Sequence, residues 1–110
     1  MLNTLIRAYE RVLELSHAML EAARNSDWDQ LVVLERERAH VVDDLRRRDL
    51  DPSRDPATRE RKRELIQAVM HCDEQISLLT QDWMHELREV LSSVSAEQRL
   101  SRTYGPQQGQ

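Results

Sequence analysis

Residues 65–94 read LIQAVMHCDEQISLLTQDWMHELREVLSSV, a stretch without glycine or proline. Apolar residues recur in it at steps of three and four, which is the spacing of one face of an α-helix. The pattern predicts one long helix over 57–94 with two adjacent apolar seams. The first seam comprises Leu65, Val69, Cys72, Ile76, Leu79, Trp83 and Val90, and the second comprises Ile66, Met70, Met84, Leu87, Leu91 and Val94.

The chain before this stretch contains two breaks. Asp27 and Gln30 have the spacing of a capping box, which opens a helix after a turn at residues 25–27. At the second break, Asp55 can cap a helix that begins near Pro56, because proline is favoured in the first turn. Residues 2–24 and 28–49 are therefore predicted to form an antiparallel helical hairpin.

The chain after Val94 also has a signal for the start of a helix, since Ser95 and Gln98 have capping-box spacing. We predict a short fourth helix over 96–104 and a disordered tail over 106–110. The expected fold is all-α and occupies a single domain, 1–110. It combines the antiparallel hairpin with one long third helix, in the manner of a three-helix bundle, and adds a short C-terminal fourth helix.

Composition excludes several classes of partner. Charged residues make up 33% of the chain, the formal net charge is −4 and the pI is near 5.5. These values favour neither nucleic acids nor anionic membranes as direct partners. The longest apolar run, Leu31–Leu34, is too short to cross a bilayer, and the N-terminus lacks a signal-peptide pattern. We expect a cytoplasmic protein.

The sequence offers no pattern typical of an active site. None of the four histidines pairs with another at the i,i+4 spacing of a helical metal site, and there is no glycine-rich loop to hold phosphate. The single cysteine, Cys72, lies among apolar residues of the long helix and is interpreted as part of the core. We predict a protein that is not an enzyme and has no metal or cofactor.

Helix lengths suggest where a partner binds. At 1.5 Å per residue, a helix over 57–94 is about 57 Å long and one over 2–24 about 35 Å. The long helix is expected to extend past the hairpin from near Leu79, leaving several hundred Å² of apolar surface that a soluble monomer rarely exposes. The predicted partner-binding residues are Leu79, Trp83, Met84, Leu87, Val90, Leu91 and Val94.

Four short motifs, in order and spread over most of the chain, resemble one known family. The chain is similar to the FliT family of flagellar export chaperones. The motifs are Ser26-Asp27-Trp28-Asp29-Gln30-Leu31, Asp73-Glu74-Gln75-Ile76, Trp83-Met84-His85-Glu86-Leu87 and Arg99-Leu100-Ser101-Arg102-Thr103-Tyr104-Gly105.

This resemblance implies a specific function. It implies a cytoplasmic chaperone that binds the flagellar filament cap protein before type III secretion and delivers it to the export ATPase complex. In some members it also implies an antagonist of the flagellar master transcription activator. A masking segment, here 96–104 with Leu100 and Tyr104, would cover a partner surface on the second and third helices.

Two alternatives fit the residues. Segment 43–64 has eight basic and seven acidic residues and no aromatic residue, so an acidic protein is a better partner for it than nucleic acid. This charge pattern around Arg59–Arg63 fits a regulator that sequesters a transcription activator. The apolar seams also fit a structural homodimer that pairs two long helices and has no other client.

Overall fold

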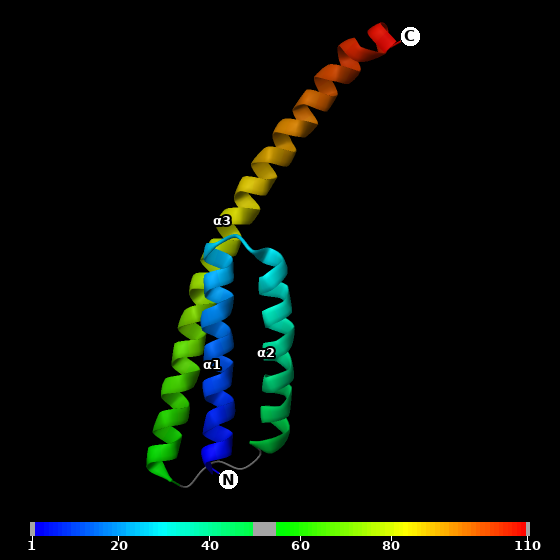
Figure 1. Ribbon diagram of the computed structural model, residues 1–110. Coiled ribbons are helices and arrows are strands. Elements are labelled where there is room, and N and C mark those ends of the chain that lie inside the picture. The colour runs from blue at the N-terminus through cyan, green and yellow to red at the C-terminus, as the bar shows by residue number, and fades with distance from the viewer. Residues whose placement is uncertain (1, 50–54, 110) are drawn as a thin grey trace. The chain divides into compact units, whose positions relative to one another are not determined.

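The protein is all-α in the computed structural model, which describes residues 2–49 and 55–109, with side chains over 4–49 and 55–100. Three helices are present in these ranges: α1 (Leu2–Arg24), α2 (Trp28–Arg48) and α3 (Pro56–Gly109). In Figure 1, α1, α2 and the first part of α3 run alongside one another in alternating directions. The predicted all-α class and the helical hairpin are confirmed.

The chain divides into two compact units, Met1–Leu79 and Thr80–Gln110, and α3 contributes residues to both. The core lies in the first unit. It comprises Leu15, Met19, Leu20, Ala22 and Ala23 of α1, Leu34 of α2, and Cys72 and Ile76 of α3, with Leu13, Trp28, Leu31, Val41 and Leu79 packed against it. The predicted placement of Cys72 in the core agrees with this packing.

The turn between α1 and α2 is built from backbone hydrogen bonds. Ser26 has a φ of 56°, the left-handed conformation that closes a helix C-terminus. The amide of Ser26 donates to the carbonyl of Ala23 at 3.1 Å, and that of Asp27 donates to Ala22 at 2.8 Å, which is the Schellman pattern. The Asp27 carboxylate accepts from the Gln30 amide at 3.2 Å, so its predicted capping role is confirmed.

The start of α3 also follows the sequence signal. Pro56 is the first helical residue. The Asp55 carboxylate accepts from the Thr58 amide at 3.3 Å and from the Thr58 hydroxyl at 2.6 Å. These hydrogen bonds hold the pKa of Asp55 below its ordinary value, and the bond from the Thr58 hydroxyl has the largest effect. Because proline lacks only an amide that would be unpaired there, the helix begins without loss.

The predicted fourth helix is wrong. α3 continues past Val94 through Ser95 to Gly109 without a break. Residues 96–100 are good helix formers, and extending an existing helix adds one hydrogen bond per residue, whereas a new helix must first be nucleated. Ser95 is therefore an interior residue and not a cap. The segment predicted as a tail begins inside α3, and Gln110 lies outside the described residues.

Candidate partner-binding surfaces

An apolar surface lies on α3 in the second unit. We call it the α3 seam: Trp83, Met84, Leu87, Val90, Leu91 and Val94. Val90 is 58% exposed and Leu91 57%, while Met84 and Val94 are also exposed. Trp83 and Leu87 are half-buried. The seam repeats at three- and four-residue steps, so these side chains share one broad face of the helix.

The other predicted site residues have different surroundings. Leu79 packs against the core of the first unit and helps to hold α3 in place there. Leu100 is exposed and belongs to the same unbroken helix as the α3 seam. The side chain of Tyr104 lies outside the described residues. The masking role of Leu100 and Tyr104 stays a prediction.

A second apolar surface is a groove in the first unit, with a volume of about 340 Å³. Met70 is 61% exposed and Ile66 is exposed beside it. Periodicity alone missed this groove, although Ile66 and Met70 belong to the predicted second seam. Its lining residues are Tyr9 and Val12 of α1, Val42, Leu45, Arg46 and Asp49, and Ile66, Val69 and Met70 of α3.

One carboxylate ties the three helices together beside this groove. Asp49, which follows α2, accepts a 2.5 Å hydrogen bond from the Tyr9 hydroxyl and forms an ion pair with Lys62 of α3. The Lys62 ammonium also lies 5.5 Å from the centroid of the Tyr9 ring, within cation–π range. The lining of the groove is therefore fixed by polar contacts as well as by packing.

A guanidinium makes the second polar link. Arg38 of α2 donates to the hydroxyl of Ser16 at 3.0 Å and to the Asp73 carboxylate at 2.7 Å. Ser16 is fully buried, and its hydroxyl donates to the Val12 carbonyl at 2.8 Å. The Arg38 side chain is only 18% exposed. The charged middle of α2, which interrupts its apolar face, thus joins α1 and α3 at this point.

Comparison with known proteins gives the family. The family model described as "Flagellar protein FliT" matches residues 6–106, which include the α3 seam and the groove. The chain belongs to the FliT family. FliT of Photorhabdus laumondii is 28% identical over 101 residues, 92% of this chain and 81% of that protein.

Other FliT proteins give a similar result. FliT of Citrobacter koseri is 30% identical over 91 residues, 83% of this chain and 75% of its own length. FliT of Yersinia pseudotuberculosis is 28% identical over 101 residues, which is 92% of this chain and 84% of that protein. No solved structure matches the chain. This FliT-family member is thus related to flagellar proteins over nearly all of its length.

In this FliT-family chain, burial and neighbouring side chains explain the pKa shifts of three titratable groups. Burial raises the pKa of Tyr9, and its hydrogen bond to Asp49 raises it further, so the phenol stays a donor. Burial would raise the pKa of Asp49, but hydrogen bonds from Lys62 and Tyr9 outweigh it and the pKa is lowered. Burial, and then the charge of Asp73, raise the pKa of the Cys72 thiol, which favours its unreactive neutral form.

The described residues contain no group of three or more histidine, cysteine, aspartate or glutamate side chains placed to hold a metal ion. Over the same residues, no helix has the length and apolar character needed to cross a bilayer.

Proposed function

We propose that this chain is a cytoplasmic flagellar export chaperone that binds the filament cap protein through the α3 seam and delivers it to the type III export apparatus. Membership of the FliT family supports the flagellar role. The observation that carries the binding mode is the exposure of the α3 seam, whose apolar side chains would be covered by a partner.

The spacing of the seam favours a helical ligand. Apolar residues at i, i+3, i+4 and i+7 on α3 match the anchors of an amphipathic helix that packs alongside it. Trp83 and Leu87 are one turn apart and half-buried, so one helical ligand could contact both side chains. Covering the apolar face of a cap-protein helix in this way would prevent the cap protein from assembling before export.

The binding step can be tested by alanine substitution. The chain is co-expressed with the C-terminal region of the cap protein from the same organism, and binding is measured by co-purification and then by calorimetry. Trp83→Ala and Leu87→Ala are each expected to weaken binding at least about tenfold, because buried aromatic and aliphatic anchors dominate such interfaces.

Leu78→Ala is the matched control, because Leu78 is exposed on α3 but lies outside the seam. It is expected to leave the affinity unchanged. Unchanged binding by both seam variants, with helicity retained in circular dichroism, would rule out the α3 seam as the cargo site.

Delivery is a separate step with its own assay. The proposed chaperone brings its cargo to the export ATPase complex, so the purified chain–cargo complex is expected to bind that ATPase complex in a pull-down. Secretion of the cap protein is also expected to fall in a strain that lacks the chain. Normal cap secretion in that strain would contradict the delivery role.

A further inference from the structure

The α3 seam is bordered by charges of opposite sign on its two sides. Over residues 80–100, the four acidic residues follow one another at steps of four, three and eight. At about 100° per residue, they fall within about 80° of arc along one border of the seam. We call them the acidic edge: Asp82, Glu86, Glu89 and Glu97. The two arginines of the same stretch, Arg88 and Arg99, fall along the other border, and all six side chains are exposed.

Both borders adjoin the apolar side chains directly. Glu86 lies three residues after Trp83 and four before Val90, so it is a neighbour of both on the helix surface. On the other border, Arg88 lies four residues after Met84. Because packed helix axes are only about 8–10 Å apart, a helix on the seam reaches both borders with its own flanking side chains.

The acidic edge is not neutralised within its own helix. Asp82 lies four residues before Glu86, and Glu89 lies three after it, and like charges at these spacings repel each other. Neither Asp82 nor Glu86 forms an ion pair with any residue that the structure describes. Glu89 contacts only His85, at 3.2 Å between side chains that are 72% and 71% exposed, and this pair is charged only when the histidine is protonated. A cation supplied by a partner would relieve the repulsion.

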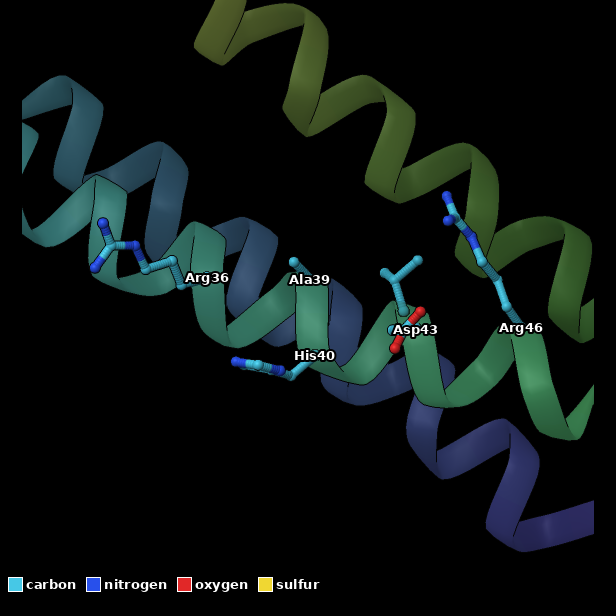
Figure 2. A pocket seen from close by; sticks show the side chains of 6 residues that line it. Arg36, Ala39, His40, Asp43 and Arg46 are labelled. Atoms are coloured by element: carbon cyan, nitrogen blue, oxygen red, sulfur yellow. The ribbon is translucent and has the colours of Figure 1, made fainter.

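The charges on the outward face of α2 are arranged differently. Figure 2 shows Asp43 on this face between Arg36 and Arg46, so the two signs are mixed along the helix. The Asp43 carboxylate also pairs with Arg47 of the same helix, at 2.7 Å. This mixture is usual for a face that meets only water, whereas residues 80–100 of α3 separate their charges by sign.

We propose that the α3 seam takes an amphipathic helix whose apolar stripe has cationic side chains along one border, the border that meets the acidic edge. This inference rests on the proposed function, because it names the kind of helix that the cargo site accepts. Charges beside the apolar contact of two helices decide which partner is chosen, as at the e and g positions of coiled coils. The apolar anchors supply the affinity, and the acidic edge selects among apolar helices.

The two borders together also select a direction. A helix with one cationic and one acidic border places the first on the acidic edge and the second on Arg88 and Arg99. Turning that helix end for end brings each of its borders to the opposite edge, where like charges meet. Such a helix therefore binds along α3 in one direction only.

The test measures binding of the cap protein's C-terminal region, from the same organism, to the full chain by calorimetry at low and high salt. Asp82→Lys/Glu86→Lys is expected to weaken binding at least about tenfold at low salt, because it reverses two contacts. At high salt the variant and the wild type should differ less, since exposed charges are screened. Trp83→Ala should weaken binding to a similar degree at both salt concentrations, because its contact is apolar.

Glu35→Lys/Glu74→Lys is the matched control. It makes the same change of charge at two exposed positions away from the α3 seam, so its effect on the affinity should be much smaller. Circular dichroism checks that each variant keeps its helicity.

Three results would overturn the proposal. If the acidic-edge variant binds like the wild type at low salt while Trp83→Ala does not, the proposed function stands and this inference fails. If Trp83→Ala and Leu87→Ala also bind normally, the seam is not the cargo site and both fail. If sedimentation of the free chain shows a mass that rises with concentration, and less so for the acidic-edge variant, a second copy of the chain covers the seam instead.

Discussion

Asp49 is the residue at which three parts of the first unit meet. It follows α2, accepts from Tyr9 of α1 and pairs with Lys62 of α3. These partners stabilise its charged form, so its pKa is lowered although burial alone would raise it. A group of this kind contributes stability above its unfolded pKa and loses that contribution as the pH falls through the lower folded value.

We expect Asp49→Asn to lower the free energy of unfolding by about 1–3 kcal/mol at neutral pH, because a hydrogen-bonded charge is removed. The difference from wild type should shrink as the pH falls below the ordinary carboxyl pKa of 3.8. Urea unfolding at a series of pH values measures it. Glu74→Gln removes an exposed carboxylate and is the control. If the difference in unfolding free energy between wild type and Asp49→Asn stays constant down to acid pH, the pKa argument is contradicted.

Arg38 is the second residue whose contacts join the helices. Its replacement by alanine leaves Asp73 without its partner and removes one hydrogen bond from buried Ser16. We expect this replacement to lower the free energy of unfolding by about 1–3 kcal/mol. In a double-mutant cycle, the Arg38–Asp73 coupling should be about 1 kcal/mol or less, because Asp73 is 46% exposed and screened by solvent. Additive effects of the two substitutions would show that the ion pair itself contributes nothing.

At the scale of the helices, local sequence signals correctly predicted where α2 and α3 begin. Asp27 and Pro56 occupy the cap and first-turn positions that the sequence indicates, because their roles depend on a few neighbouring residues. The same spacing at Ser95 and Gln98 was misleading. A capping box competes there with an existing helix and with the good helix formers that follow, and no glycine or proline lies between Pro56 and Gly105.

The interior position of Ser95 can be tested by two substitutions. Ser95→Ala is expected to stabilise the helix locally by about 0.5 kcal/mol, since alanine is the better interior residue, and Ser95→Gly to destabilise it by a similar amount. Amide hydrogen exchange over residues 96–100 measures both effects. If Ser95 capped a separate helix, alanine would cost about 1 kcal/mol and glycine only a few tenths, which is the opposite order.

At the scale of the whole molecule, the core and the proposed cargo surface belong to different units. The sequence located the α3 seam because a seam needs only the period of one helix. It did not locate the groove or the link from Arg38 to Ser16, because both depend on how residues of three helices are placed against each other. Leu79 shows the same limit: it has the period of the seam but packs in the core.

This division predicts two levels of protection from hydrogen exchange. Amides of residues 15–20, whose neighbours form the core, should exchange at the free energy of global unfolding. Amides of residues 84–94 should exchange through local opening, because their apolar side chains are largely exposed in the free chain. Adding the cap-protein fragment should slow exchange over 84–94. Exchange there that is as slow as in the core before any addition would contradict the prediction.

The half-buried side chain of Arg38 also restricts how the bundle can be assembled incorrectly. A slip of α2 by one helical turn, about 5.4 Å, would carry the charge away from both Ser16 and Asp73 and leave it without these partners. Leucine-rich helices alone would tolerate such a slip, since one apolar residue replaces another. A single arginine thus favours one register of α2 against α1 and α3.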